Sequence, residues 1–372
     1  MKLTCQRGAL ANAFQTVGGV VPSRTPKAIL QNVKLSALRE GAELLATDQE
    51  VGIRYHLAEV QVDEPGQILL PHGRISAILR ELRDDVVVLE STGESTSIRS
   101  GFSQFDLPSQ DAAEFPPVAG FDEENYYVVA AGLLREMIHR TIFATDLETS
   151  RYALGGILVV PDGERIELVA TDSRRLALTQ GACRVQGTVE ARSATPVVPA
   201  RAMALLERSL PEPAGEVHIA LHANDVLFKA HNFTLYSRLL EGRFPRYKDV
   251  VPKAGTVVIE LQTGPFHSAV RQAQIITNEE SRGVDFTFDK GLLVLNSRAA
   301  DVGKSRIELP ISYDGAPLTI RFDPRFVADF LKVLEPERQV RLELTDSESA
   351  AVLRTDDGYT YVIMPLARDR GS

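Results

Sequence analysis

The residue types that most often carry out chemistry occur in this sequence, but few of them stand at the spacings that chemistry requires. Gly303-Lys304-Ser305 resembles the end of a phosphate-binding loop, a motif that needs a further glycine five residues before Gly303. Arg298 stands at that place, and the segment has the pattern of a hairpin, not of a loop that enters a helix. The sequence therefore does not predict a nucleotide-phosphate site here.

The histidines and the paired acidic residues do not converge either. His218 and His222 are four residues apart, but they lie in a strand-patterned stretch, where that spacing does not direct both rings at one metal ion. Paired carboxylates such as Asp84-Asp85 lie in turn-like segments and are expected to be solvated. We therefore predict no catalytic residue, cofactor or metal site, and we expect that the protein is not an enzyme.

Two aspartates end similar segments, Leu44-Leu-Ala-Thr-Asp48 and Leu168-Val-Ala-Thr-Asp172. If their carboxylates met, they could serve a nucleotide-handling enzyme as an acid or a metal site, and this is one alternative interpretation. The two segments, however, occupy the same place in successive repeats of the chain, which puts Asp48 and Asp172 in different domains. Their recurrence therefore favours a structural motif over a shared active site.

These repeats cover the whole chain. Amphipathic helices, each followed by a strand-like run, are predicted at 70–82, 198–210 and 322–334, about 124 to 128 residues apart. Each repeat opens with a strand and a helix that has a buried stripe at helical spacing, at 1–17, 126–143 and 257–276. Each is expected to close with a strand that stops at a proline, in Phe115-Pro116, Phe244-Pro245 and Met364-Pro365.

The repeats predict three domains of one design, at residues 1–122, 126–252 and 253–372. Each would hold two helices and roughly six to eight short strands, which makes the fold class α+β. The composition is that of an ordinary globular protein, with 44% hydrophobic and 24% charged residues. The two cysteines fall in different repeats, so we expect no disulfide framework and a cytoplasmic location.

Basic residues recur in register on the second helices of the repeats. Arg80, Arg208 and Lys332 occupy one equivalent position, and Arg201 matches Arg325 at another. The net charge of −9 opposes a surface that attracts DNA everywhere, but it permits one basic face within an acidic shell. Cations on equivalent helices could neutralise phosphates without reading sequence, although helices commonly carry basic residues for no such purpose.

Three further segments are highly specific. Ala170-Thr-Asp-Ser-Arg-Arg-Leu-Ala177, Glu241-Gly-Arg-Phe-Pro-Arg-Tyr247 and Tyr361-Val-Ile-Met-Pro-Leu366 resemble signature segments of the bacterial DNA polymerase III beta subunit, the sliding clamp family. The segments around Arg24 and Asn278 fit as well, and the resemblance runs from Met1 to about Ala367.

This resemblance implies a head-to-tail homodimeric ring of six similar domains that encircles double-stranded DNA without sequence preference. The ring would tether the replicative polymerase alpha subunit and serve the clamp loader, repair polymerases and other proteins with a clamp-binding motif. Processivity would then come from topology and effective concentration. A clamp-fold scaffold that binds partners but does not encircle DNA is the alternative.

The resemblance also implies residue roles. A pocket for a short apolar partner peptide would be lined by residues of the second and third repeats: Leu154, Thr171, Ser173, Arg174, Arg175, Leu176, Pro245, Val250, Ser347, Val362, Met364, Pro365 and Leu366. Residues expected at DNA, from the resemblance or from repeat register, are Arg24, Arg80, Arg151, Arg201, Arg208, Arg325 and Lys332. The dimer interface would pair Phe105 and Leu107 with Ile275 and Ile276 of a second copy. Ser173 and Arg174 depart from the Gly and His common in the family, which makes the pocket rim bulkier and more cationic.

Overall fold

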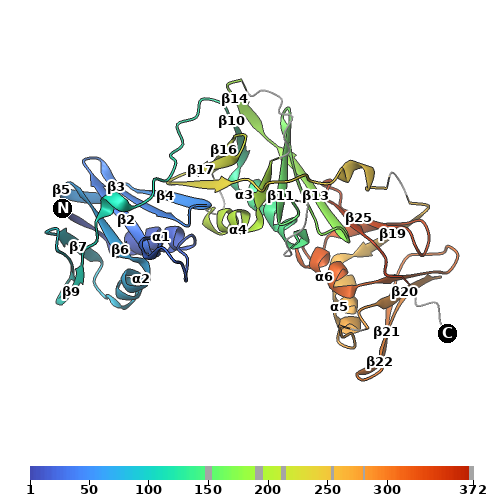
Figure 1. The fold of residues 1–372 in the computed structure, drawn as a ribbon. Helices are drawn as coiled ribbons and strands as arrows, with labels where there is room; N and C mark the ends of the chain where they lie inside the picture. Colours follow the sequence, from blue (N-terminus) through green and yellow to red (C-terminus); the bar gives the residue numbers. More distant parts are fainter. Residues whose placement is uncertain (147–152, 189–195, 211–214, 253–254, 280, 368–372) are drawn as a thin grey trace. The chain divides into compact units, whose positions relative to one another are not determined.

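The computed structural model describes residues 1–146, 153–188, 196–210, 215–252, 255–279 and 281–367 (Figure 1). The chain forms two compact units, residues 1–135 with 183–239 and residues 136–182 with 240–372. Helix α3 (Ala131–His139) spans the point of division. No helix in these described ranges has the length and apolar character needed to span a membrane.

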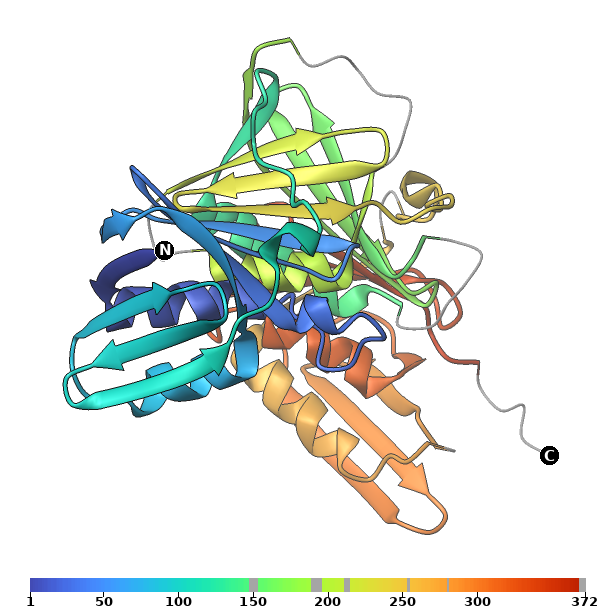
Figure 2. The same cartoon turned by 60° about the vertical axis from the view of Figure 1, so that its left-hand side comes forward.

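The first unit contains two antiparallel sheets. The smaller has the strand order β5-β1-β7-β8-β9 (β7 to β9 are cyan in Figure 2), and the larger has the order β14-β10-β16-β17-β18-β4-β3-β2-β6. Helices α1 (Arg7–Gly18) and α2 (His72–Glu81) pack against each other, and α4 (Ala200–Ser209) follows the short strand β15 (Val197–Pro199). The other strands are β1 Lys2–Gln6, β2 Asn32–Leu38, β3 Gly41–Thr47, β4 Val51–Leu57, β5 Val60–Glu64, β6 Gly66–Pro71, β7 Val86–Ser91, β8 Ser95–Ser100, β9 Ser103–Pro108, β10 Tyr126–Ala130, β14 Arg184–Gln186, β16 Glu216–Leu221, β17 Asp225–Ala230 and β18 Phe233–Arg238.

The second unit follows the same plan. Its larger sheet runs in the order β11-β12-β13-β26-β25-β24-β19, and its smaller sheet in the order β22-β21-β20-β23. Helices α5 (Thr263–Gln274) and α6 (Pro324–Lys332) lie side by side (Figure 1), and α5 also packs on β21 and β22. The strands are β11 Gly156–Asp162, β12 Arg165–Thr171, β13 Arg175–Ala182, β19 Val257–Gln262, β20 Val284–Asp289, β21 Leu292–Ala299, β22 Gly303–Pro310, β23 Leu318–Phe322, β24 Gln339–Leu344, β25 Ala351–Arg354 and β26 Thr360–Ile363.

The predicted α+β fold with its repeated strand–helix openings is confirmed. β1 with α1, β10 with α3 and β19 with α5 occupy the three expected places, and α2, α4 and α6 are the predicted second helices. Most residues of the predicted apolar stripes are buried, such as Leu10, Phe14 and Val17 of α1, whereas Ile78 of α2 is half-buried. Helix α6 also begins as sequence rules demand, because the Asp323 carboxylate accepts a hydrogen bond from the Arg325 amide and Pro324 stands in the first turn.

The expectation of a closing strand before proline is confirmed only in the third repeat. β26 ends directly before Met364, whereas Phe115-Pro116 and Phe244-Pro245 lie in connecting segments outside the helices and strands. Proline favours an extended conformation in the residue before it and lacks a backbone donor, but this does not require that the segment pairs with a neighbour. The strand prediction was therefore wrong at these two places.

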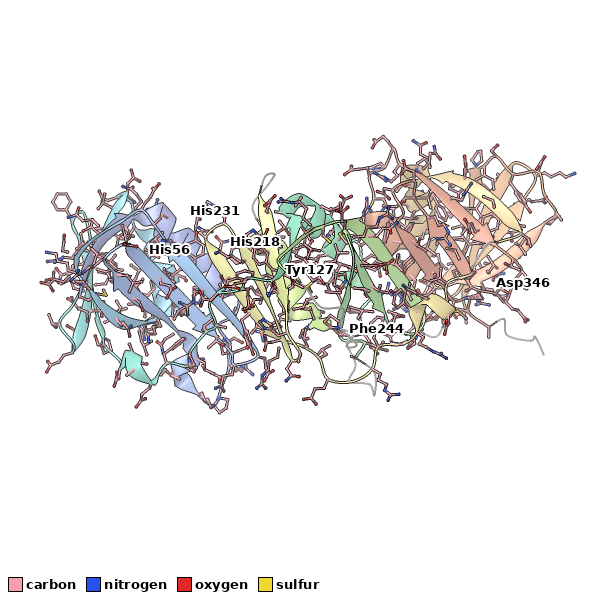
Figure 3. All side chains as sticks on the ribbon, turned by 90° about the horizontal axis from the view of Figure 1, so that it is seen from above. His56, Tyr127, His218, His231, Phe244 and Asp346 are labelled. Carbon is pink, nitrogen blue, oxygen red and sulfur yellow. The ribbon has the colours of Figure 1, made fainter. Side chains whose placement is uncertain are left out.

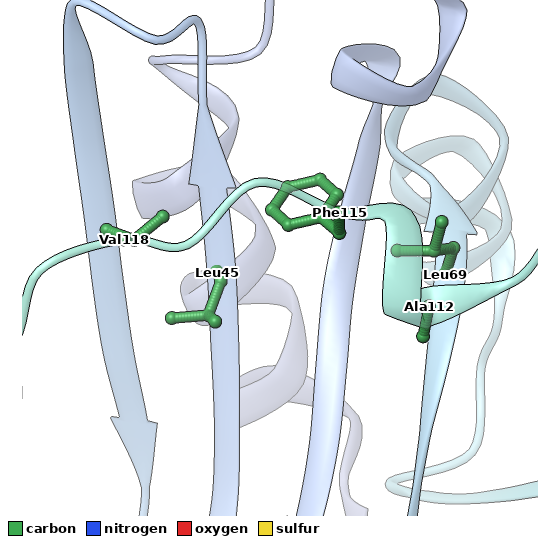
Figure 4. Packing of buried hydrophobic residues seen from close by; sticks show 5 residues of the cluster. All are labelled: Leu45, Leu69, Ala112, Phe115 and Val118. Atoms are coloured by element: carbon green, nitrogen blue, oxygen red, sulfur yellow. The ribbon is translucent and has the colours of Figure 1, made fainter.

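The first connecting segment instead covers the larger sheet of the first unit. Ala112, Phe115 and Val118 pack on Leu45 of β3 and Leu69 of β6, and all five side chains are buried (Figure 4). Arg54 fixes the segment further, since its guanidinium donates to the Val118 carbonyl at 2.6 Å. Phe115 is thus an anchor for the connection between β9 and β10.

The far end of this segment is held by a histidine. The His222 ring nitrogens lie 2.6 Å from the Asp225 carboxylate and 3.1 Å from that of Glu123. Partial burial lowers the pKa of His222, but these two carboxylates raise it by more, so that its pKa lies above the usual value. Below its folded-state pKa, the charged imidazolium therefore joins the connecting segment to the turn between β16 and β17.

This contact predicts a pH-dependent contribution to stability. Because the pKa of His222 is higher in the folded state, its contribution is fully present below the unfolded-state pKa of about 6.5 and is lost as the pH rises through the folded-state value. We expect His222→Gln to be less stable than the parent at a pH of about 5.5 and the gap to narrow toward a pH of about 8.5 in urea titrations. The exposed His56→Gln is the control, and a gap that stays constant with pH contradicts this role of His222.

Candidate functional site

The Ala-Thr-Asp segments form the same turn in both units. In the second unit the Thr171 hydroxyl donates to the Arg175 carbonyl at 2.6 Å, and the Asp172 carboxylate accepts from the amides of Arg174 and Arg175, both at 3.0 Å. Ser173 between them adopts a left-handed backbone, with φ of 70°. The turn is built by side chains that accept and donate locally, which is what Thr and Asp do at strand ends.

The first unit repeats this turn bond for bond. The Thr47 hydroxyl donates to the Val51 carbonyl at 2.8 Å, and the Asp48 carboxylate accepts from the amides of Glu50 and Val51 at 2.9 and 2.8 Å. Gln49 takes the left-handed place, with φ of 81°. Asp48 and Asp172 therefore lie in different units as turn acceptors, which removes the basis for a shared acidic site.

Other candidate chemistry is also accounted for by structure. Gly303 to Ser305 begin strand β22, so the expected hairpin is confirmed. His218 stacks on Tyr126 with ring centroids 4.6 Å apart, and Figure 3 labels it with His56 and His231 on the first unit. Across the described ranges, no group of three or more His, Cys, Asp or Glu side chains is arranged to hold a metal ion.

Arg175 has the most contacts of the candidate residues. Its side chain is 10% exposed, and it donates to the carboxylates of Asp172 at 2.9 Å and Asp329 at 2.6 Å and to the Phe143 carbonyl at 2.6 Å. The guanidinium also lies 4.4 Å from the ring centroid of Phe326. Burial lowers the pKa of Arg175, but its acidic and hydroxyl neighbours more than compensate and raise it, so the group is a permanent cation.

Several residues that the sequence assigned to a peptide pocket lie near Arg175 in the chain or in the sheet. Leu176 pairs in register with Val362, both buried, and the Met364 amide donates to the Arg174 carbonyl at 2.8 Å. The Ala153 amide donates to the Arg243 carbonyl. This hydrogen bond joins the segment that contains Leu154 to the segment that contains Pro245. Val250 and Met364 are 56% and 48% exposed, Leu154 and Thr171 are buried, and Pro245, Ser347, Pro365 and Leu366 are half-buried. We call these residues with Ser173 to Leu176 the peptide surface.

Two residues of this region were missed from the sequence. Phe326 and Asp329 of α6 both contact Arg175, and the Phe326 carbonyl also accepts a hydrogen bond from the Tyr361 hydroxyl at 3.0 Å. The sequence does hold a hint of their position. Phe326 and Asp329 are three residues apart, so they share one face of the helix, and each is next to a buried residue of α6. That spacing, however, does not reveal which strand the face meets.

The basic residues expected at DNA differ in whether they form an ion pair among the described residues, and Arg208, which forms none, donates to the Ala204 carbonyl at 3.2 Å. Arg24, Arg80, Arg208 and Lys332 are exposed, and the last three stand in the last turns of α2, α4 and α6. Cations there also favour the helix dipole, which gives their recurrence a local structural reason. Arg201 instead pairs with Asp48, Arg325 pairs with Asp323 at 2.6 Å, and Arg151 lies outside the described residues.

Arg208 also borders a hollow between α1 and α4. The hollow measures about 340 Å³ and carries no acidic side chain in its lining: Asn12, Gln15, Thr16, Gly19, Leu205, Arg208 and Ser209.

Of the residues expected at a dimer interface, two lie on an edge strand and two follow a helix. Phe105 and Leu107 belong to β9, the last strand of its sheet, and Phe105 is 38% exposed. Ile275 and Ile276 directly follow α5, and Ile275 is 73% exposed. Edge strands and bare apolar side chains are both open to pairing with another chain.

The arginine cluster makes a stability prediction. Asp329→Ala removes one of two carboxylates from a buried guanidinium, and we expect a loss of about 1 to 2 kcal/mol in the free energy of unfolding, less than for a fully buried pair because Asp329 is partly exposed. Asp249→Ala breaks the exposed pair with Arg246 and should change stability by about 0.5 kcal/mol or less. Equal effects of the two variants in denaturant unfolding contradict a structural role for Asp329.

Comparisons with known proteins agree along the whole chain. Residues 1–119, 128–246 and 248–367 match the N-terminal, central and C-terminal domains of the DNA polymerase III beta subunit family. The beta sliding clamp of Pseudomonas aeruginosa is 31% identical over 370 residues, covering 98% of this chain and 100% of the relative. That of Caulobacter vibrioides is 33% identical over 380 residues, with the same coverage.

Solved structures show the same likeness. The DNA polymerase sliding clamp of Bacillus subtilis matches with a TM-score of 0.92 at 28% identity, and the DNA polymerase III beta subunit of Pseudomonas aeruginosa with 0.91 at 31%. Each comparison covers 99% of this chain and 100% of the other. Since three consecutive domains match in order, this chain belongs to the family of the DNA polymerase III beta subunit, the beta sliding clamp, a non-catalytic processivity subunit.

Proposed function

We propose that two copies of this chain close head to tail into a ring around double-stranded DNA and tether the replicative polymerase. The observation that carries this proposal is the match of three successive clamp domains over nearly the full chain. We assign the domains to residues 1–122, 126–252 and 253–372. Processivity then needs no chemistry from the protein, because a tethered polymerase keeps a high effective concentration at the primer end.

DNA contacts are proposed for the exposed cations. Arg24, Arg80, Arg208 and Lys332 are exposed and could neutralise phosphates, which suits a ring that must move along DNA without reading bases. Arg201 and Arg325 already have carboxylate partners, so we give them a secondary role in placing their helices. Arg151 is retained as a candidate on the family resemblance alone.

Ring closure is proposed to join β9 of one copy to the third domain of the next. Phe105 and Leu107 on the free edge of β9 would meet Ile275 and Ile276, so that apolar side chains pack beside a shared strand ladder. The contact is heterologous, and a two-fold arrangement of such contacts closes a ring.

The peptide surface is the proposed docking place for partners. The apolar side chains of Met364 and Val250 are exposed, and a flexible methionine adapts to different apolar groups. We infer that the polymerase alpha subunit, the clamp loader and repair polymerases dock here, and that the ring works in the cytoplasm. A scaffold that binds such partners without encircling DNA is the competing function.

A topological experiment separates these two functions. The protein is loaded onto nicked circular DNA with a clamp loader, freed of unbound protein and followed by gel filtration before and after the circle is cut. We expect retention for many minutes on closed circles and rapid release upon cutting, because a ring slides off free ends. Equal release rates from circles and linear DNA favour the scaffold.

The proposed dimer interface predicts how a variant without its apolar centre will associate. Replacing both Ile275 and Ile276 by alanine removes the apolar centre of a modest interface and should weaken association by about 3 to 5 kcal/mol. We expect a folded monomer in sedimentation, with unchanged circular dichroism. The control is Val258→Ala, an exposed apolar residue of β19 in the larger sheet of the same unit. A double variant that sediments like the parent would place the interface elsewhere.

A further inference from the structure

The opening strands of the three repeats differ in what lies beside them. In the first repeat β5 pairs antiparallel with β1, and in the second β14 pairs antiparallel with β10. We call β5 and β14 the covering strands. In the third repeat β19 pairs with β24 and is the last strand of its sheet, so within the described ranges one edge of β19 has no strand beside it.

The segment that supplies the covering strand takes another course in the third repeat. β5 lies between β4 and β6, and β14 lies between β13 and β15, so residues 311–317 between β22 and β23 occupy the corresponding place. These residues bind to the turn between β20 and β21, where the Gly291 amide donates to the Tyr313 carbonyl at 2.7 Å and the Ile311 amide donates to the Gly291 carbonyl at 3.0 Å. The segment is therefore held at that turn and does not pair with β19.

The open edge of β19 has the side-chain pattern of a strand inside a sheet. Ile259 and Leu261 are buried, whereas Val258 is 49% exposed and Glu260 and Gln262 are exposed. An edge strand also presents a row of backbone amides and carbonyls, with which an extended peptide can pair. β19 can thus accept one more strand.

The covering strands indicate which apolar residue such a strand needs. Counted back from the helix that follows each opening strand, Ile259 corresponds to Leu3 in β1 and to Tyr127 in β10. A valine stands opposite both, Val62 in β5 and Val185 in β14. We therefore expect an apolar residue opposite Ile259 in a strand that pairs with β19.

The covering strands also bring charges that complement the sheet they join. Glu64 of β5 stands opposite Lys2 of β1. Arg184 of β14 forms an ion pair with Glu216 of β16. Opposite charges on neighbouring strands stabilise their pairing, so charge is a second criterion for an added strand.

Glu260 is the charged residue of β19. Arg341 stands opposite it in β24, but no ion pair joins Glu260 to a cation in the part of the chain that the structure describes. A second copy of β19 would bring another glutamate and no cation, so charge does not favour pairing between two copies. A basic side chain on an added strand would complement Glu260.

We propose that the open edge of β19 binds an extended segment of another protein as an added antiparallel strand, with an apolar residue opposite Ile259 and Lys or Arg opposite Glu260. Backbone hydrogen bonds hold the segment, and the two side-chain positions select it. β19 carries none of the residues of the peptide surface, so this is a second docking place, and it does not depend on the proposed function.

Two synthetic peptides test this edge, Thr-Thr-Val-Arg-Val-Thr-Thr and the same peptide with Glu in place of Arg. Hydrogen–deuterium exchange of the full chain is followed by mass spectrometry at increasing concentrations of each. We expect the Arg peptide to slow exchange at residues 257–262, because outward-facing amides of β19 become hydrogen-bonded. It should reach half of this effect at about fivefold lower concentration than the Glu peptide.

Substitutions at Glu260 test the charge criterion. Glu260→Gln should remove the preference for the Arg peptide, and Glu260→Lys should reverse it, because the sign of this exposed charge decides which peptide is repelled. The matched control is Glu335→Lys, the same change at an exposed residue between α6 and β24, and it should keep the preference for Arg.

Three results overturn the proposal. The first is unchanged exchange at residues 257–262 with both peptides, or a preference for Arg that survives Glu260→Lys. The second is slower exchange at residues 361–366 alone, which would assign the peptides to the peptide surface. The third is slower exchange of β19 when the protein concentration is raised without peptide, which would show that a second copy occupies the edge.

Discussion

The charged guanidinium of Arg175 is almost fully buried. It is stable there because three segments of the chain supply hydrogen-bond acceptors for it. Asp172 comes from its own turn, the Phe143 carbonyl from the segment after α3, and Asp329 from α6. An unpaired buried charge costs several kcal/mol, so these segments must stay in register with one another. The positions of Ser173, Arg174 and Met364 follow from that requirement, since the turn that Arg175 anchors accepts the Met364 amide.

In the first unit the corresponding turn is also joined to a helix by an ion pair, but the positions of the acidic and basic residues are exchanged. Its turn carries Val51 where the second has Arg175, and the Asp48 carboxylate is met by Arg201 of α4, which also donates to the Val20 carbonyl. The helix thus supplies the cation in the first unit, whereas α6 supplies the anion Asp329 in the second. Both arrangements fasten a strand-end turn to a helix. In the second turn, the position before the cation is Arg174, whose side chain is exposed.

Periodicity predicted the elements well because apolar spacing directly decides which faces are buried, as in α1 and α6. The aspartates of the Ala-Thr-Asp segments were correctly separated by the repeat, but their role as turn acceptors needed coordinates. Phe115-Pro116 was misassigned because a proline marks an extended segment without saying whether it pairs with a strand or packs on a sheet. Phe326 and Asp329 were missed because their function depends on which strand end meets α6, a long-range contact that no local pattern encodes.

Repeat register alone does not show which of the recurring cations are paired with a carboxylate in the same chain. Arg80, Arg208 and Lys332 recur in the last helical turn, where a positive charge is favoured by the dipole whether or not DNA is present. Arg201 and Arg325 recur too, but each is bound to an aspartate. A DNA phosphate would have to compete with that carboxylate for the arginine. Fewer phosphates would then be neutralised and fewer counterions released, so the DNA affinity would depend less on salt. In the proposed ring, a chain with a net charge of −9 would gain its retention on DNA from ring closure and not from affinity, because its net charge opposes tight binding to phosphates.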